Sequence, residues 1–323
     1  MFSPQTEWTP PEELKDLSGA KQIAIDLETR DPNLTTLGSG SVRKDGEIVG
    51  IAVAVEGWSG YYPIAHEGGG NIDKKITLDW FKDVLRTPAT KIFHNAMYDV
   101  SWIRSLGFKI NGQIIDTMIA ASLVNENRLR YNLDSLAKEY VGIGKSEKLL
   151  YEAAKEWGVN PKKEMWRLPA MHVGEYAEQD AVATLKLWER LKQEITAQDL
   201  WDIFNVETEL FPCLVDMKFK GVRVDLEKAH KIKKDLIKEE KQHLKKIKDD
   251  TGLDVEIWAA ASIAKVFDKL KLPYDRTATG APSFTKNFLS QHPNETAQAI
   301  AQSREINKAH TTFIDTILEH EHN

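Results

Sequence analysis

With 323 residues, 41% hydrophobic and 28% charged, the chain has room for about two globular domains of ordinary composition. No apolar run approaches the roughly 18–20 residues that a membrane-spanning helix needs, and the polar N-terminus lacks a secretory pattern, so we expect no membrane contact. The net charge of −6 argues against coating DNA by bulk electrostatics, and the single cysteine, Cys213, excludes an internal disulfide. A cytoplasmic location in a bacterium or a virus-infected bacterial cell is the expectation.

The first part of the chain alternates strands and helices. Runs rich in apolar and β-branched residues predict strands at 21–27, 48–55, 58–63 and 91–94. Helical spacing of apolar residues predicts helices at 78–85 (with Thr77 as N-cap), 97–106, 116–124, 133–140, 146–157 and 173–191. This order predicts an α/β fold in which helices cover a mixed sheet.

The chain changes character after about residue 197. Helices are predicted at 201–219, 226–250 and 259–270, followed by a turn-rich stretch at 274–282 and two closing helices, with 221–225 as the only short β-type run. We therefore predict two domains, 1–197 and 198–323. The lysine-rich stretch between 228 and 248 is open to two interpretations, a solvated helix face or a patch that binds nucleic acid.

Two carboxylates stand in an apolar strand, in the run IAIDLET. Asp26 and Glu28 are two residues apart, so their side chains project from the same face of the strand. Carboxylate oxygens are preferred ligands of Mg²⁺ and Mn²⁺, and a buried carboxylate without a partner is costly. An exposed strand end is the alternative interpretation of this pair alone.

Three further residues extend the pattern. Asp99 follows a predicted strand in FHNAMYD, and Tyr176 and Asp180 are four apart on one face of a predicted helix in YAEQDA. Singly, Asp99 could be a first-turn acid favoured by the helix dipole, and the other two an ordinary hydrogen-bonded pair. Together, in this order, the four acids predict a two-metal site that cleaves nucleic acid from its 3′ end.

The motifs DLET, HNAMYD and YAEQD resemble those of the 3′–5′ exonuclease domain of family A (DNA polymerase I-like) DNA polymerases, within the DEDD exonuclease superfamily. The segments IIDTMIAASLVN and YNLDSLAKEYVG strengthen the likeness, which covers residues 21–191. Glu175 stands where one subclass has histidine, so the chain resembles the tyrosine subclass. The resemblance implies a ribonuclease-H-like fold with a mixed five-stranded sheet and helices.

The resemblance also implies roles for the site residues. Asp26, Glu28 and Asp180 would hold one of two divalent metal ions (Mg²⁺ or Mn²⁺), and Asp26 with Asp99 would hold the other. Tyr176 would orient the attacking water, and 5′-mononucleotides would leave from a single-stranded 3′ end. The residues expected to contact the terminal nucleotide are Thr29, Asn95 and Tyr98, whereas Asp116 is expected to be structural.

The second part resembles the beginning of the polymerase region, with an all-α thumb-like domain. The run TATGAPSFTKNFL is similar to a thumb loop that contacts the primer-template duplex, and the residues expected to do so are Arg276, Thr277, Thr279, Ser283 and Lys286. Palm and fingers motifs are absent from these 323 residues, so we expect no polymerase activity from this chain alone. The chain would be a split subunit with a palm-and-fingers partner, or a truncated form.

Two other functions stay open at this point. A ribonuclease D-like RNA exonuclease uses the same tyrosine-type motifs, but it predicts a different helical domain downstream. A catalytically silent duplex-binding or assembly module of a polymerase is the second alternative. The intact set of four acids favours an active proofreading-type 3′–5′ DNA exonuclease.

Overall fold

The computed structural model describes residues 6–144 and 147–322, which form two compact units, Met1–Gly221 and Val222–Asn323. The first unit extends beyond the boundary predicted at 197/198. Helix α9 (Trp201–Lys220) belongs to it because Phe204, Phe211 and Val215 are buried in its cores. In sequence, α9 looks like the start of a new domain because it is helical and follows the last strand of the sheet. Its apolar face nevertheless packs in the first unit.

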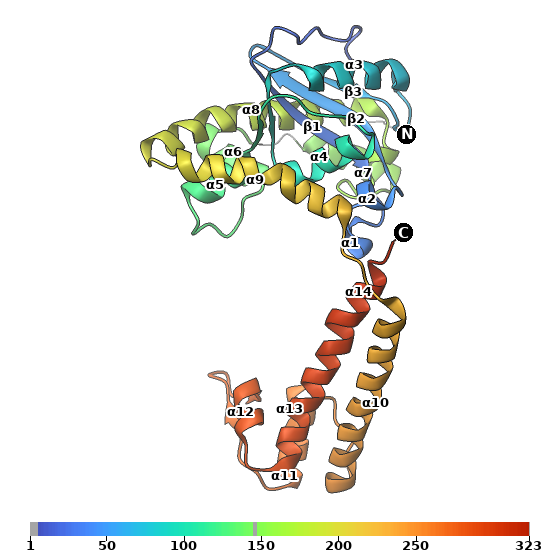
Figure 1. The fold of residues 1–323 in the computed structure, drawn as a ribbon, viewed down its shortest axis with the longest axis vertical. Coiled ribbons are helices and arrows are strands. Elements are labelled where there is room, and N and C mark those ends of the chain that lie inside the picture. Colours follow the sequence, from blue (N-terminus) through green and yellow to red (C-terminus); the bar gives the residue numbers. More distant parts are fainter. Residues whose placement is uncertain (1–5, 145–146, 323) are drawn as a thin grey trace. The chain divides into compact units, whose positions relative to one another are not determined.

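A five-stranded mixed sheet organises the first unit, which confirms the predicted fold class (Figure 1). The strand order is β3-β2-β1-β4-β5, with β1 antiparallel to β2 and parallel to β4. The strands are β1 (Gln22–Arg30), β2 (Glu47–Val55), β3 (Trp58–Pro63), β4 (Thr90–Phe93) and β5 (Ile114–Asp116). The predicted strands are confirmed. Strand β5 is an addition; it is three residues long, and its last residue, Asp116, is the position where a helix was predicted to begin.

Helices surround this sheet. Besides α9 they are α1 (Leu34–Leu37), α2 (Gly40–Arg43), α3 (Lys74–Arg86), α4 (Ala96–Ser105), α5 (Thr117–Val124), α6 (Leu133–Val141), α7 (Lys148–Trp157), α8 (Gly174–Ala197) and the 3₁₀ turns η1 (Met165–Arg167) and η2 (Ala170–His172). The start predicted for α7, Ser146, lies outside the described residues. Thr77 is not the N-cap of α3: Asp73 caps it by accepting a hydrogen bond from the backbone of Ile76, one turn earlier.

Residue alternation along β1 sends its side chains into two different cores. Ile23, Ile25 and Leu27 pack in the core that includes α3 and α4, whereas Ala24 packs in the core that includes α8. Asp26 and Glu28 have the parity of Ala24, so they project toward the α8 side of the sheet. The strand register therefore aims both predicted metal ligands at the helix that carries Tyr176 and Asp180.

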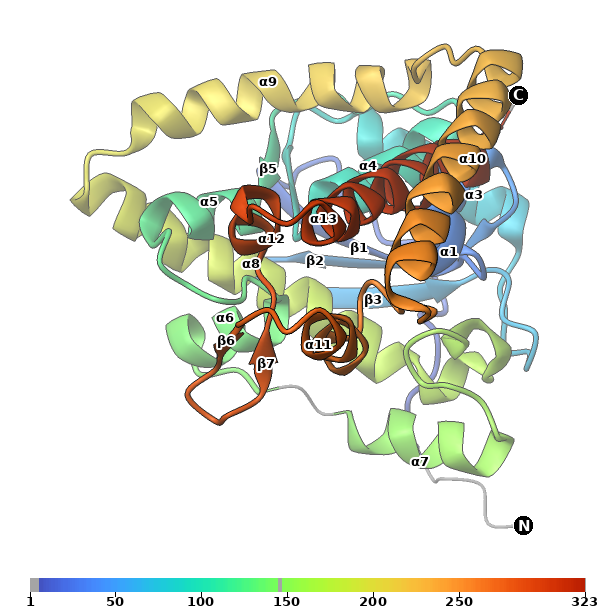
Figure 2. The same ribbon diagram turned by 90° about the horizontal axis from the view of Figure 1, so that it is seen from below.

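The second unit is helical with one small hairpin. Its elements are α10 (Leu226–Thr251), α11 (Ala260–Lys269), β6 (Asp275–Arg276), β7 (Pro282–Ser283), α12 (Lys286–Gln291), α13 (Glu295–Lys308), the π-helical turn η3 (Ala309–Ile314) and α14 (Asp315–Glu319). The prediction of a helical unit is confirmed, with one small addition: β6 and β7 pair in the turn-rich stretch, as seen in Figure 2. The β-type run at 221–225 is not a strand. No helix in the described parts of either unit has the length and apolar content needed to cross a membrane.

Candidate active site

The edge of the sheet that carries the candidate site is shaped around Glu28. Glu28 pairs with Gly50 of β2, and the register shifts by a bulge between Glu28 and Thr29. A side chain at position 50 could not fit, since a Cβ there would lie 1.9 Å from the hydroxyl oxygen of Tyr61. The glycine thus lets the Tyr61 phenol approach the backbone opposite Glu28, and bulges of this kind commonly re-aim side chains at active sites.

Tyr61 is a site residue that the sequence did not single out. It is fully buried, and burial, together with the charges of Glu28 and Asp26, raises the pKa of its phenol. Its hydroxyl lies 2.6 Å from His66 Nε2, and His66 Nδ1 lies 3.0 Å from the carbonyl of Leu168. Burial lowers the pKa of His66 to about 4, so the imidazole is neutral and its Nε2 can accept a hydrogen bond from the phenol. The signal in the sequence, an aromatic pair at the end of a strand, is too common to identify it.

Asp99 approaches the same edge from α4. Its side chain is buried, and its Oδ1 accepts a hydrogen bond of 3.0 Å from the backbone N–H of Leu27. Strand β1 pairs with β4 only from Gln22 to Ala24. At Leu27, between Asp26 and Glu28, the Asp99 carboxylate therefore accepts the backbone hydrogen bond that β4 does not. Burial and the adjacent negative charge of Asp26 raise the pKa of Asp99. The two acids are therefore neighbours that repel each other.

The turn before α4 is held by Asp116. Its two oxygens accept hydrogen bonds from the backbone N–H groups of Asn95 (3.0 Å), Ala96 (2.8 Å) and Met118 (2.8 Å). These bonds stabilise Asn95 in a left-handed conformation with φ 63°, and they also cap α5. The structural role predicted for Asp116 is confirmed.

Tyr176 and Asp180 lie one turn apart on α8 and are both buried. Burial raises the pKa of Tyr176 far above its usual range, and the negative charges of Asp180, Glu28 and Asp26 raise it further. These couplings place the phenol among three of the four predicted acids. A neutral hydroxyl in that position can donate and accept hydrogen bonds without becoming an anion.

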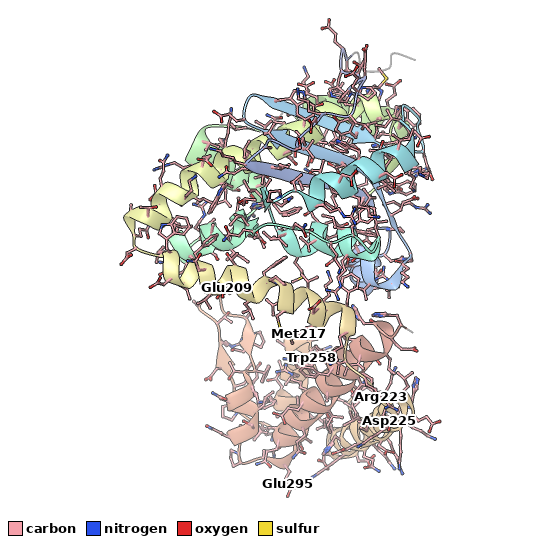
Figure 3. All side chains as sticks on the ribbon, turned by 45° about the horizontal axis from the view of Figure 1, so that its top comes forward. Glu209, Met217, Arg223, Asp225, Trp258 and Glu295 are labelled. Atoms are coloured by element: carbon pink, nitrogen blue, oxygen red, sulfur yellow. The ribbon has the colours of Figure 1, made fainter. Side chains whose placement is uncertain are left out.

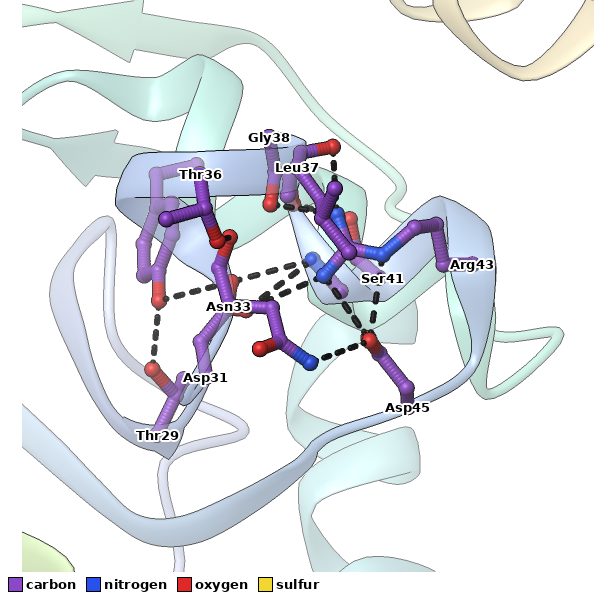
Figure 4. A network of polar contacts seen from close by, with 12 residues as sticks. Thr29, Asp31, Asn33, Thr36, Leu37, Gly38, Ser41, Arg43 and Asp45 are labelled. Atoms are coloured by element: carbon purple, nitrogen blue, oxygen red, sulfur yellow. Dashed lines mark hydrogen bonds and ion pairs between the residues drawn. The ribbon is translucent and has the colours of Figure 1, made fainter. Parts of the chain in front are cut away.

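Two of the predicted substrate contacts meet beside this edge (Figure 4). The hydroxyl oxygens of Thr29 and Tyr98 are 2.6 Å apart, and Tyr98 also donates a longer bond of 3.5 Å to Asp31. Burial raises the pKa of Tyr98 to about 12. Arg43 supports Asp31 from behind, at 3.8 Å, and pairs with Asp45 at 2.9 Å. Asn95 lies at the start of the same helix turn as Tyr98, but its side chain is not part of this network.

The donor set fits divalent cations of the Mg²⁺ and Mn²⁺ type. All of the donors are hard carboxylate oxygens, and the raised pKa of Asp99 beside Asp26 reports negative charge that a cation would stabilise. Among residues 6–144 and 147–322, no three side chains of His, Cys, Asp or Glu already form a closed metal site. Like charges repel when no cation lies between them, which opposes a closed arrangement of these carboxylates without metal. The residues concerned are Asp26, Glu28, Asp99 and Asp180.

The residues predicted to contact duplex DNA lie around the hairpin of the second unit. Arg276 donates to the carbonyl of Gly280 at 2.9 Å, the hydroxyl groups of Thr277 and Thr279 are 3.0 Å apart, and Lys286 pairs with Glu305 at 2.8 Å. Ser283 is on β7. These contacts show a self-supporting hairpin, whose role toward DNA stays a prediction.

The lysine-rich helix α10 uses part of its charge within its own unit. Lys233 pairs with Asp315 (2.6 Å), Lys246 with Glu295 (2.6 Å) and Lys248 with Asp254 (2.9 Å). Glu295 is labelled in Figure 3. Both interpretations of the helix stay open, because many of its other lysines are exposed.

Comparison with known proteins decides the family. Residues 2–196 match the model of the 3′–5′ exonuclease of family A DNA polymerases, which covers the sheet and every candidate catalytic residue. The chain belongs to this exonuclease family. The match ends near the predicted domain boundary, so α9 lies beyond the matched domain although it packs in the same unit.

Relatives of this exonuclease are longer DNA polymerases. The chain is 33% identical over 325 residues to the DNA-directed DNA polymerase of Pseudomonas phage M6, covering 98% of this chain and 49% of that protein. It is 30% identical over 316 residues to DNA polymerase DpoZ of Salmonella phage PMBT28, covering 92% and 48%. DNA polymerase I of Pseudomonas aeruginosa is 27% identical over 326 residues, covering 95% and 34%. The chain thus spans about half the length of its phage relatives or less.

A solved structure shares the fold of this exonuclease and its helical neighbour. The POL domain of Pol1 from M. smegmatis, in complex with DNA primer-template and dNTP, aligns with a TM-score of 0.68 at 17% identity. The alignment covers 93% of this chain and 47% of that one. At this identity the likeness establishes fold alone.

Proposed function

We propose that the chain removes nucleotides from the 3′ end of single-stranded or frayed DNA as 5′-mononucleotides. The residues that would hold two divalent cations, Mg²⁺ or Mn²⁺, are Asp26, Glu28, Asp99 and Asp180. One observation supports the proposal most strongly. Asp26 and Glu28 project from β1 toward α8, and their negative charges, with that of Asp180, raise the pKa of Tyr176 on that helix. Asp99 reaches the same strand through the backbone of Leu27.

Bound cations would stabilise the attacking and leaving oxygens of an in-line displacement at phosphorus. The chain's own groups prepare that displacement. Tyr176 stays a neutral phenol, because its pKa is raised, and its hydroxyl orients the attacking water. Thr29 and Tyr98 form a preassembled hydroxyl pair for the terminal nucleotide, and Asn95 lies at the start of the same helix.

We further propose that the exonuclease proofreads for a family A polymerase. The named relatives are DNA polymerases, and their alignments cover 98% and 95% of this chain, so they include the helical unit. In this view the domain after residue 197 is thumb-like, and palm and fingers act with it from a continuous chain or a partner subunit. The polymerase relatives also argue against the ribonuclease D-like alternative.

The test combines cleavage with a readout that is independent of activity. A 5′-labelled DNA strand with a mismatched 3′ end should shorten stepwise in Mg²⁺ and not with chelator. Asp99→Asn should lose at least about 100-fold in rate. Mg²⁺ should also raise the Tm of the natural protein, and Asp99→Asn should lose this rise, although Asn can still accept the Leu27 hydrogen bond.

Asp134→Asn is the matched control, because Asp134 is exposed on α6. It should keep both the rate and the Tm response. No shortening of the strand in Mg²⁺ or Mn²⁺ by the natural protein would overturn the proposed activity. Faster digestion of an RNA strand of the same sequence would favour the ribonuclease D-like function.

A further inference from the structure

A surface cleft opens beside Tyr176. Its volume is about 630 Å³, and it is lined by α7 and by the segment 159–162 that follows it. Lys162 links this cleft to the catalytic residues, since its ammonium lies 5.4 Å from the ring centroid of Tyr176 and 5.9 Å from that of Tyr151. The other polar side chains of the cleft are Glu152, Lys155 and Asn160.

The backbone that carries Lys162 is fixed. Asn160 Oδ1 accepts hydrogen bonds from the backbone N–H groups of Lys162 (3.0 Å) and Lys163 (2.9 Å), and Glu164 accepts from Asn160 N (2.8 Å). The turn therefore presents the Lys162 side chain to the cleft from a defined position. Lys163, next to it, is exposed and does not line the cleft.

The ammonium of Lys162 has a replaceable partner. It forms an ion pair of 2.5 Å with Glu147, and the two side chains are 48% and 28% exposed. Pairs this exposed contribute little to stability, typically about 1 kcal/mol or less. A phosphate group could therefore displace Glu147 at small cost, and a charge-assisted bond to phosphate would replace the bond to the carboxylate.

Electrostatics gives a reason for a cation at this place. The negative charges of Asp180, Glu28 and Asp26 all act on Tyr176, and such a field opposes a polyanionic strand. The ammonium of Lys162 lies against the ring of Tyr176, on the side of the cleft. A positive charge there offsets repulsion where the strand must come closest to the acids.

We infer that Lys162 binds a backbone phosphate of the DNA strand next to the scissile bond, exchanging Glu147 for that phosphate as the strand enters. The inference rests on the proposed function for its substrate. It makes Lys162 a substrate-positioning residue, and it makes Glu147 a competitor that weakens binding of the strand.

Steady-state kinetics of three variants of the full chain test this exchange on a 5′-labelled single strand in Mg²⁺. Lys162→Gln should raise KM about fivefold to tenfold, with a smaller change in kcat. The slope of log KM against log salt should fall by about 0.7, the value for one phosphate of a single strand that the protein no longer neutralises. Glu147→Gln should lower KM about twofold to threefold, since it frees the ammonium. Lys163→Gln should match the natural protein.

The salt slope distinguishes binding of phosphate from a structural role. Loss of one phosphate contact lowers the number of released counterions by one, whereas a misfolded turn would not have this specific effect. An unchanged slope in Lys162→Gln, or an equal decrease of the slope in Lys163→Gln, would overturn the phosphate contact. An unchanged or raised KM in Glu147→Gln would overturn the exchange.

A binding assay keeps the inference distinct from the proposed activity. Fluorescence anisotropy of the same strand, measured with chelator, reports the phosphate contact without cleavage. If the natural protein binds DNA more tightly than Lys162→Gln but never shortens it, the proposed activity fails and the phosphate contact stands. If both bind equally while the natural protein cleaves, the phosphate contact fails and the activity stands.

Discussion

Replacement of Asp116 should destabilise the first unit strongly, although the residue is not one of the proposed ligands. Asp116 accepts three backbone hydrogen bonds, from Asn95, Ala96 and Met118, and is 7% exposed. Hydrogen bonds to charged groups contribute about 1.5–3 kcal/mol each, and Asp116→Ala leaves three donors unsatisfied. Because the three effects overlap, we expect the free energy of unfolding to fall by about 3–5 kcal/mol.

Asp116→Asn refines this expectation. The amide retains one oxygen, which can keep the bonds from Asn95 and Met118, but its NH₂ group faces the N–H of Ala96. One bond of three is removed, so a decrease of about 1–2 kcal/mol is expected. Glu56→Ala, in the exposed turn between β2 and β3, is the control and should change stability by less than about 0.5 kcal/mol.

Urea unfolding followed by tryptophan fluorescence suits the measurement, because every tryptophan except Trp258 precedes residue 222. Trp258 is labelled in Figure 3. The signal therefore reports mainly on the first unit. A decrease below about 1 kcal/mol in Asp116→Ala, or equal decreases in the alanine and asparagine variants, would refute the hydrogen-bond reasoning.

Three further predictions concern the same unit. The free energy of unfolding should fall by up to about 3 kcal/mol as pH drops from 6.5 toward 4. The pKa of His66 is lowered to about 4 in the folded state, so the unfolded state binds the proton first. In urea titrations, His66→Gln should flatten this pH dependence. Gly50→Ala should cost more than about 2 kcal/mol, since its Cβ would meet the Tyr61 hydroxyl at 1.9 Å, whereas Gly19→Ala, with open space around it, should cost little in thermal melts. Tyr176→Phe should slow cleavage while the Mg²⁺ concentration that gives half of the Tm rise stays nearly constant; a large increase in that concentration would contradict its assigned role.

Local sequence patterns were sufficient to predict which of the candidate side chains share a face. A spacing of two in a strand puts Asp26 and Glu28 on one face, and a spacing of four in a helix does the same for Tyr176 and Asp180. Both periods are local properties of the backbone, so they hold whatever the rest of the chain does. The same local signals predicted β1, β2, β3, β4 and most helices within a few residues.

The way these faces meet depends on the tertiary fold. Strand β1 separates from β4 after Ala24, and Asp99 then accepts the hydrogen bond from Leu27. This arrangement depends on strand order and twist. The place of Tyr61 over Gly50 and of Lys162 beside Tyr176 depends on how neighbouring segments of the chain pack against each other. Likewise α9 joins the first unit because cores formed by earlier residues accept its apolar face. Periodicity tells which way a side chain points, but its neighbour is set by packing between different segments of the chain, which no local pattern encodes.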